Sequence, residues 1–215
     1  MKLRFSILLP LLMLPALLPV KAQGLDYNIL WDLQQHRTEP MNAAMGGLSN
    51  TLVLTPAVPA GLLVGGWLSD DRALLRSGCA VGGSLLIAVA LTEGMKYSIR
   101  RPRPYNAYPL TLTPVRTTFG YSFPSGHTSL TFAVATSLSI CYPKWYIIAP
   151  SMLWASGVAF SRLYLGVHYP SDVLTGALVG AGSAVIGCLV VRKMFPEEEP
   201  ESTPKFYLPP LTLSF

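Results

Sequence analysis

Five stretches of the chain contain no charged residue, and they restrict the possible folds more than any other feature. Each has 16 to 19 residues, which with its flanks reaches the roughly 20 residues that a helix needs to cross about 30 Å of hydrocarbon. The stretches are Thr51–Leu68, Ser77–Thr92, Thr128–Pro143, Trp145–Ser161 and Val173–Val191. They predict an all-α fold: an integral membrane helical bundle of five transmembrane helices after an N-terminal signal peptide or a sixth helix.

Buried helices of a soluble all-α protein are the alternative explanation for these stretches. Such helices normally carry a polar stripe at helical period, and these stretches show almost none. Charged residues make up only 13% of the chain, against about 25% in a typical soluble domain. Lipid is therefore the better candidate for what covers much of the surface.

The N-terminus has the order of a secretory signal. Lys2 and Arg4 precede an uncharged run over 5–20, and the small Ala22 follows. Three prolines in that run count against a permanent spanning helix. We expect a signal peptide at 1–22, possibly retained as an anchor, an interfacial helical segment at 23–50, a membrane-embedded domain at 51–195 and a polar tail at 196–215.

The formal charge of +5 does not indicate a nucleic-acid partner. Three basic residues fall within the first 22 positions, so the remainder has 13 basic and 11 acidic residues, too balanced for a polyanion surface. The positive-inside bias places Arg72, Arg76, Lys144, Arg192 and Lys193 in the cytoplasm. The segments 96–127 and 162–172 then share the exterior side.

Small residues and isolated groups are interpreted as structural. Three glycine pairs at a spacing of four would let helices pack closely in lipid: Gly61 and Gly65, Gly78 and Gly82, Gly176 and Gly180. The cysteines 79, 141 and 188 are expected to be small buried residues, because no cysteine or histidine spacing supports a metal site. His36 is expected to be an exposed histidine without a special role.

The polar residues of the two exterior segments carry the chemistry, since polar groups are costly in a lipid-dominated chain. Pro124-Ser125-Gly126 precedes an apolar run and predicts a helix start, where free N–H groups favour an anion. Lys96, Arg103 and Arg162 come from separate elements and could surround phosphate oxygens. A phosphate-binding site is therefore expected where these segments meet.

Two histidines complete a possible reaction centre. Pro170 fits the first turn of the last helix, so Asp172 would lie in that turn and could orient the ring of His168. An imidazole held in this way is a good nucleophile towards phosphorus. His127, at another helix start, could protonate the leaving oxygen. Cations and N–H groups would neutralise the phosphate charge, so no metal and no cofactor is expected.

These residues resemble the three signatures of the type 2 phosphatidic acid phosphatase superfamily, in the right order and without a departure. The signatures are Lys96-x6-Arg103-Pro104, Pro124-Ser125-Gly126-His127 and Ser161-Arg162-x5-His168-x3-Asp172. The resemblance implies metal-independent phosphate hydrolysis through a phosphohistidine, with 51–195 as the phosphatase domain. It assigns His168 as nucleophile, Asp172 as its partner and His127 as general acid. It also assigns phosphate binding to Lys96, Arg103, Ser125, Gly126 and Arg162.

The expected enzyme is a multi-pass protein of the bacterial inner membrane that acts on a lipid at the periplasmic face. Expected substrates are undecaprenyl pyrophosphate, phosphatidylglycerophosphate, phosphatidic acid or lipid A. Arg100, Arg101 and Arg116 either contact a larger anionic headgroup or are simply solvated. Two alternatives stay open: a soluble-type periplasmic acid phosphatase or vanadium haloperoxidase, and a non-catalytic membrane module that binds a lipid headgroup.

Overall fold

A computed structural model describes residues 21–196, which form helices, turns and loops without any β-strand. The predicted signal peptide lies almost wholly outside the described residues, and so does the polar tail after Pro196. The α-helices are α2 (Lys21–Gln35), α3 (Glu39–Asn50), α4 (Leu54–Leu68), α5 (Arg72–Ile99), α6 (Pro104–Ala107), α7 (Gly126–Cys141), α8 (Trp145–Tyr164) and α9 (Pro170–Met194). A short 3₁₀ turn, η3 (Thr51–Val53), joins α3 to α4. The predicted all-α fold is confirmed for this part of the chain.

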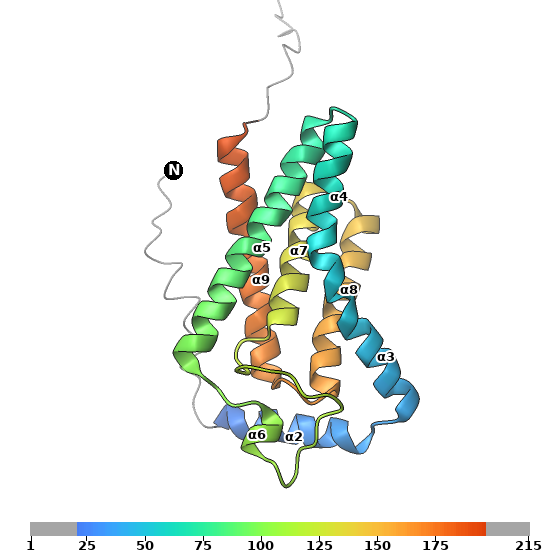
Figure 1. Ribbon diagram of the computed structural model, residues 1–215, viewed down its shortest axis with the longest axis vertical. Helices are drawn as coiled ribbons and strands as arrows, with labels where there is room; N and C mark the ends of the chain where they lie inside the picture. The colour runs from blue at the N-terminus through green and yellow to red at the C-terminus, as the bar shows by residue number, and fades with distance from the viewer. Residues whose placement is uncertain (1–20, 197–215) are drawn as a thin grey trace, which may run out of the picture.

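One set of helices runs along the long axis of the molecule, and other elements cover one end of it (Figure 1). The long-axis helices are α4, α5, α7, α8 and α9, and each contains all or most of one predicted charge-free stretch. Helices α2 and α6 lie across the end at which α5 finishes and α7 begins (Figure 1). The two exterior segments of the sequence prediction therefore meet at this end.

Three helical segments of the described chain are long and apolar enough to cross a membrane: Glu39–Leu68, Arg72–Ala107 and Pro170–Met194. The first combines α3, η3 and α4, so it begins at Glu39 and not at Thr51, because the polar residues of α3 do not interrupt the helix. Helix α7 has 16 residues, or about 24 Å of helix, which is shorter than the hydrocarbon core. The prediction of five spans is thus not confirmed.

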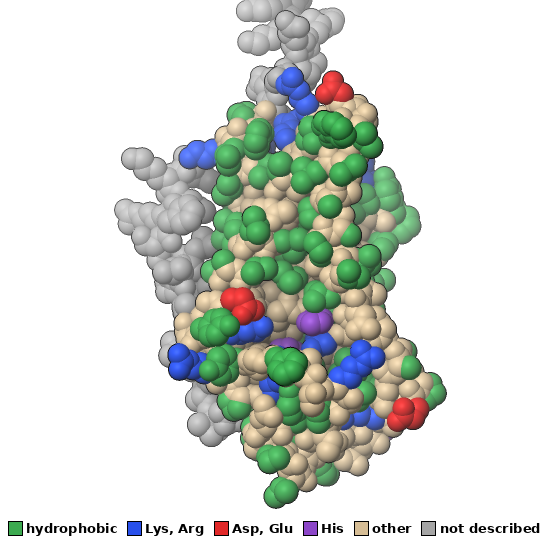
Figure 2. Space-filling model, in the orientation of Figure 1, with side chains coloured by type: hydrophobic (Ala, Val, Ile, Leu, Met, Phe, Trp, Pro, Cys, Tyr) green, Lys and Arg blue, Asp and Glu red, His purple; other side chains and the backbone are tan. Residues whose placement is uncertain are grey.

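The surface between the two ends is suited to lipid. On the face shown in Figure 2, charged side chains gather near the ends, and a broad band between them carries apolar and uncharged groups. Large apolar side chains stand exposed on three different helices, with Leu86 and Leu153 both 73% exposed and Leu189 57% exposed. Exposed apolar area on this scale is typical of a surface that faces a membrane or a partner protein.

Helices α7 and α9 approach so closely that only glycine fits between them. A Cβ atom at Gly176 would lie 2.7 Å from the carbonyl oxygen of Ser125, and one at Gly180 would overlap the carbonyl oxygen of Ser129. This pair is therefore a close-packing pair, as predicted from its spacing. The prediction was wrong for Gly61 and Gly65, where a Cβ atom would have nothing within 4 Å.

In the remaining pair, one glycine makes a close contact and the other does not. Gly78 packs tightly on Leu63, with 2.7 Å from a Cβ to Leu63 Cγ, whereas Gly82 leaves room for an ordinary contact of 3.7 Å with Pro59. The spacing of small residues thus identifies close approach only where a neighbouring backbone or side chain actually faces the glycine.

Helix α2 attaches to the same end through a small apolar cluster. Leu30, which is 1% exposed, packs with Leu112 of the long loop and Tyr169 at the start of α9. The burial of one leucine contributes about 1.5 to 3 kcal/mol. Helix α2 is therefore held against Leu112 of the long loop and against Tyr169, the residue before α9.

Replacement of Gly180 by alanine tests the contact between α7 and α9. We expect Gly180→Ala to lower the stability of the detergent-purified protein by about 1 to 3 kcal/mol, or roughly 2 to 10 °C in melting temperature, because the new methyl group meets backbone atoms. Gly182→Ala is the matched control on the same helix, since nothing lies within 4 Å of its Cβ. Equal melting temperatures for the two variants would contradict the close approach.

Candidate active site

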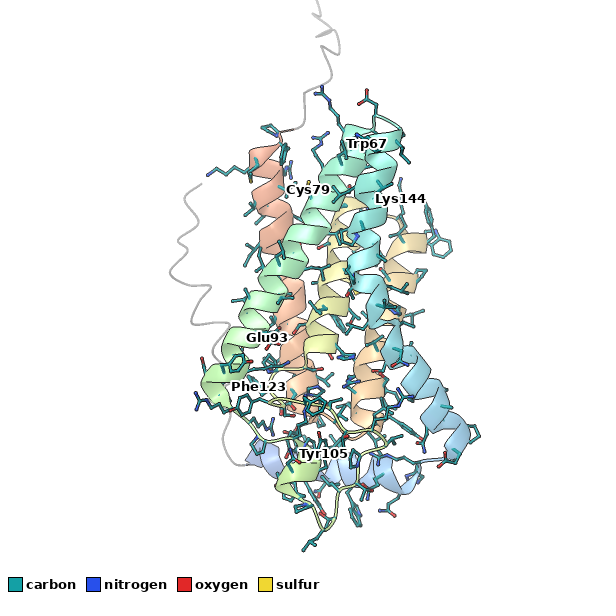
Figure 3. The ribbon with its side chains drawn as sticks, in the orientation of Figure 1. Trp67, Cys79, Glu93, Tyr105, Phe123 and Lys144 are labelled. Atoms are coloured by element: carbon teal, nitrogen blue, oxygen red, sulfur yellow. The ribbon has the colours of Figure 1, made fainter. Side chains whose placement is uncertain are left out.

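The three sequence signatures meet at the covered end of the bundle. Lys96 lies in the last turn of α5, Ser125 precedes α7, and Asp172 lies in the first turn of α9. The amide N–H of Ser125 donates to the backbone oxygen of Asp172 at 3.0 Å, which ties the start of α7 to that of α9. In Figure 3, Glu93, Tyr105 and Phe123 lie in this half of the molecule, whereas Trp67, Cys79 and Lys144 lie in the opposite half.

Arg103 is fixed by backbone carbonyls. It is 4% exposed and donates to the oxygens of Phe119, Gly120 and Val167 at 2.8 to 3.0 Å. Its Nη1 also lies 3.3 Å from Nε2 of His168. A guanidinium group is only a donor, so this contact favours the tautomer in which Nε2 accepts and the ring proton is on Nδ1.

Arg162 and Lys96 bring two further cations to the site. Arg162 is 5% exposed, donates from Nη1 to Ser49 Oγ of α3 at 2.5 Å, and keeps a buried Nε without a partner among the described residues. The ammonium of Lys96 bonds Glu93 at 3.1 Å and lies 3.5 Å from the Cβ position of Gly126. The buried Nε of Arg162 is thus an unsatisfied donor, which is costly. A bound anion would satisfy it.

The start of α7 presents donors to the same space. Ser125 is the N-cap residue and is fully buried, but its side chain makes no capping bond and instead accepts from Thr128 at 3.0 Å. The first N–H groups of α7, beginning at Gly126, are therefore left for a ligand, and the helix dipole favours an anion there. The predicted helix start at Ser125-Gly126 is confirmed.

His127 lies in the first turn of α7, ahead of the apolar part of that helix, and is surrounded by cations. Its pKa is lowered to about 3, first by burial and then by Arg162, His168, Lys96 and Arg103. The structure thus brings His127 together with every cation of the predicted phosphate site. Its ring is neutral among these cations, and the negative charge of a bound phosphate would favour its protonation.

His168 is also held as a neutral imidazole. Burial is the main cause that lowers its pKa to about 4, and the neighbouring Arg103 and Arg162 add to the effect against the opposing Asp172. Its Nδ1 lies 3.5 Å from Asp172 Oδ2, too long for a good hydrogen bond, and has no other acceptor among the described residues. The ring thus has its Nδ1 side towards the carboxylate and its Nε2 towards Arg103.

The carboxylate of Asp172 accepts hydrogen bonds from three separate donors. It is fully buried, and its Oδ2 accepts from Ser122 Oγ at 2.5 Å and from the amide of Tyr169 at 2.9 Å, the second bond capping α9. Its Oδ1 accepts from Arg101 at 2.7 Å. The sequence-based reasoning missed Ser122, which shares no signature with Asp172 and lies 50 positions before it.

The other polar residues singled out in the sequence have different outcomes. Arg101 is turned towards Asp172 and Asp26, so neither of its two expected positions, at a headgroup or in solvent, describes it. Arg100 donates to the carbonyl of Tyr97, and Arg116 lies near Asn50 at 3.4 Å; both are exposed. His36 is an exposed residue of the loop after α2 and bonds the Asp32 carbonyl.

Comparison with known protein families and curated proteins agrees with this arrangement. The sequence model of the PAP2 superfamily matches residues 77–196, more than half of the chain. The chain is 39% identical over 99 residues to an undecaprenyl-diphosphatase of Sulfolobus acidocaldarius, covering 46% of this chain and 47% of that protein. It is 33% identical over 75 residues to a lipid A 4'-phosphatase of Bacteroides thetaiotaomicron, covering 35% of this chain and 33% of that one. The matches thus span less than half the length of these relatives.

A solved structure shows the same fold over most of the chain. The transmembrane PAP2-type phosphatidylglycerolphosphate phosphatase from Bacillus subtilis superposes with a TM-score of 0.70, covering 88% of this chain and 96% of the other. Sequence identity in this superposition is 22%. The likeness extends the family match to the N-terminal helices of the bundle as a likeness of fold.

The protonation states of the two site histidines can be tested directly. Because their pKa values are lowered to about 3 and about 4, both rings should stay neutral as the pH of the ligand-free protein falls from 8 to 5. Saturating inorganic phosphate should raise the pH at which His127 becomes protonated. Nitrogen NMR of protein labelled at histidine measures both effects, with His36→Gln removing the third signal. A midpoint above pH 6 for either ring without ligand would contradict the expectation.

Proposed function

Because the chain belongs to the PAP2 superfamily, we propose that it is a phosphatase that hydrolyses a lipid phosphate or pyrophosphate without a metal, through a phosphohistidine. The observation that carries the proposal is the gathering of Lys96, Arg103 and Arg162 around two neutral histidines and the open start of α7. Cations and free N–H groups bind the oxygens of a phosphoryl group. Two neutral imidazoles beside that group provide a nucleophile and a proton carrier.

The first step of the proposed reaction transfers the phosphoryl group to His168. The lone pair of Nε2 attacks phosphorus, the bond from phosphorus to the leaving oxygen breaks, and protonated His127 gives its proton to that oxygen. Asp172 stabilises the positive charge that develops on the ring of His168 through Nδ1. The three cations stabilise the equatorial oxygens in the transition state.

The second step returns the enzyme to its starting state. Neutral His127 accepts a proton from water while the water oxygen attacks phosphorus, and the bond to Nε2 breaks. Inorganic phosphate leaves, His127 carries the proton for the next cycle, and His168 is again neutral. The same residue thus serves as acid and then as base, as reversibility of the two half-reactions requires.

An apolar groove supports a lipid as the substrate. A cavity of about 680 Å³ lies between α4, α5 and α7, and its walls include Leu52 and Thr55 from the α4 side and Leu130 of α7. Leu130 is one helical turn beyond His127, and Leu52 follows Ser49, the partner of Arg162, by three positions. The wall of the groove thus lies one helical turn from His127 along α7, and in our proposal the groove takes an acyl or prenyl chain while the phosphate stays among the cations.

The substrates named for the relatives share this chemistry. They include an undecaprenyl diphosphate and the 4'-phosphate of lipid A, and the similar fold belongs to a phosphatidylglycerolphosphate phosphatase. We propose undecaprenyl pyrophosphate, phosphatidylglycerophosphate, phosphatidic acid and lipid A as the substrate panel for this chain. All four present a phosphomonoester or diphosphate attached to long apolar chains.

The proposed location is the bacterial inner membrane with the site at the periplasmic face. Basic residues at the end of the bundle opposite the site support this orientation, because positively charged residues favour the cytoplasmic side. They are Arg72, Arg76, Lys144, Arg192 and Lys193. Either a cleaved signal peptide or a retained anchor with Lys2 and Arg4 inside gives the same placement.

Removal of the nucleophile is the main test of this function. Detergent-purified protein should release phosphate from the substrate panel in the presence of a chelator, and vanadate should inhibit it as a trigonal-bipyramidal mimic. His168→Ala should lower turnover by at least about 1000-fold, whereas the exposed His36→Ala serves as the matched control. Unchanged turnover in His168→Ala would overturn the assignment of the nucleophile.

The covalent intermediate can be observed separately. With a substrate carrying labelled phosphorus, His127→Asn should accumulate label on the protein, because hydrolysis of the phosphohistidine loses its general base. The label should be stable to alkali and lost in acid, and absent from the double variant that also carries His168→Ala. Turnover by wild-type protein without label at position 168 under any quench condition would exclude the covalent route.

A further inference from the structure

The guanidinium group of Arg101 joins two buried carboxylates from opposite ends of the described chain. Its Nη1 donates to Asp172 Oδ1 at 2.7 Å, and its Nη2 donates to Asp26 Oδ2 at 2.8 Å. Asp26 is 4% exposed and lies in α2, outside the residues 77–196 that match the family. A residue from the N-terminal helix is thus two ion pairs away from the reaction centre.

Asp26 also bonds the residue that follows the start of α9. Its Oδ1 accepts from the amide of Ser171 at 3.0 Å, and its Oδ2 accepts from Ser171 Oγ at 2.5 Å. Ser171 Oγ in turn lies 2.7 Å from Nη1 of Arg101. Tyr169 stacks below the same guanidinium, with 3.9 Å from Cζ to the ring centroid. The position and the plane of the Arg101 guanidinium are therefore fixed by the two carboxylates, by Ser171 and by the ring of Tyr169.

This arrangement controls how Asp172 faces His168. A carboxylate has two oxygens in one plane, so a bond that fixes Oδ1 also decides where Oδ2 points. Arg101 holds Oδ1, which leaves Oδ2 to Ser122, the amide of Tyr169 and the Nδ1 side of His168. The orientation of the nucleophilic ring thus depends on a guanidinium that lies on the far side of the carboxylate.

The second carboxylate, that of Asp26, changes the charge balance of the cluster formed by Asp26, Arg101 and Asp172. Arg101 alone would neutralise Asp172, and a neutralised carboxylate is a weaker partner for a ring that becomes positively charged. With Asp26 present, one cation is shared by two anions, so the group keeps a net charge of about −1 by formal count. Asp172 then remains able to stabilise the charge that forms on His168 during attack.

We propose that Asp26 and Arg101 are a positioning pair for the reaction: they orient Asp172, keep it an effective anion and through it hold His168 with Nδ1 protonated and Nε2 free. Neither residue contacts the substrate. The inference rests on the proposed function, and it makes α2 a part of the catalytic apparatus although the signatures of the family do not include it.

The kinetic test uses two conservative variants with matched controls. Asp26→Asn keeps the size of the side chain and an oxygen acceptor but removes its charge. Arg101→Lys keeps the positive charge but removes the planar guanidinium group that bonds both carboxylates. We expect each to lower kcat by about 10- to 100-fold, the range for a lost hydrogen bond to a charged group, while KM changes less than about threefold. Asp32→Asn on the exposed face of α2 and Arg100→Lys beside Arg101 should match wild type in both parameters.

A second measurement does not need activity. Nitrogen NMR at pH 7.5 should show the ring of His168 in wild-type protein with its proton on Nδ1, because Nδ1 faces Asp172 Oδ2 and Nε2 faces the donor Nη1 of Arg103. In Asp26→Asn and Arg101→Lys we expect a mixture in which part of the population carries the proton on Nε2. Asp32→Asn should keep the wild-type signal. A purely structural attachment of α2 would lower the melting temperature and leave this tautomer unchanged.

The outcomes separate the two proposals. If wild type and controls hydrolyse no lipid phosphate, the proposed function fails, and the His168 tautomer alone decides the positioning role. Unchanged kcat and an unchanged tautomer in folded variants would overturn the inference. A rise in KM at constant kcat would also overturn it, because Arg101 would then contact the substrate headgroup. If Asp26→Asn does not fold, Arg101→Lys decides by the same criteria.

Discussion

The buried carboxylate of Asp172 is the interaction on which the rest of the structure depends. It caps α9 through the amide of Tyr169, accepts from Ser122 of the long loop, and pairs with Arg101 after α5. The backbone oxygen of the same residue accepts from Ser125 at the start of α7. A fully buried charge is tolerated only when several donors satisfy it, so three helices and a loop must meet at this point. The gathering of polar side chains at this end of the bundle is a consequence of that requirement.

The close contact of α7 and α9 makes this meeting possible. Gly176 leaves room for the carbonyl oxygen of Ser125, and Gly180 leaves room for that of Ser129. The start of α7 therefore lies within hydrogen-bond distance of the first turn of α9. The charge-free helices supply the apolar exterior, while charged groups gather towards both ends of the molecule, outside the apolar band (Figure 2). A membrane bundle thus holds a charged site without burying it in hydrocarbon.

The site is electrostatically prepared for an anion. Burial and nearby cations keep both histidines neutral, and Arg162 keeps a buried donor without a partner among the described residues. Both features impose a cost that a bound phosphoryl group removes, since its oxygens satisfy donors and its charge offsets the cations. In the proposed reaction, binding of the substrate would therefore also favour the protonation of His127.

Local chemistry made much of the fold and site predictable. Proline at 170 predicts a helix start with Asp172 in its first turn, and the structure has both. Charge-free runs predict helices because backbone groups in an apolar region must bond within their own segment. The expected boundary at Thr51 differed because α3 continues into α4, and the count of spans stays undetermined by run length alone. Glycine spacing predicted one close contact correctly and another wrongly, since spacing does not say what faces a helix.

The sequence by itself determined the helical class, the apolar surface and the residue types of the proposed phosphate site, because these follow from periodicity, charge and spacing within short segments. Only the tertiary structure decided which partner each charged group takes. Arg101 could have faced solvent, a headgroup or a carboxylate, and it bonds Asp172 and Asp26, from α9 and α2. Such a choice depends on where distant helices place their side chains in space, and pairing across 70 or more positions leaves no signal in the local order of residues.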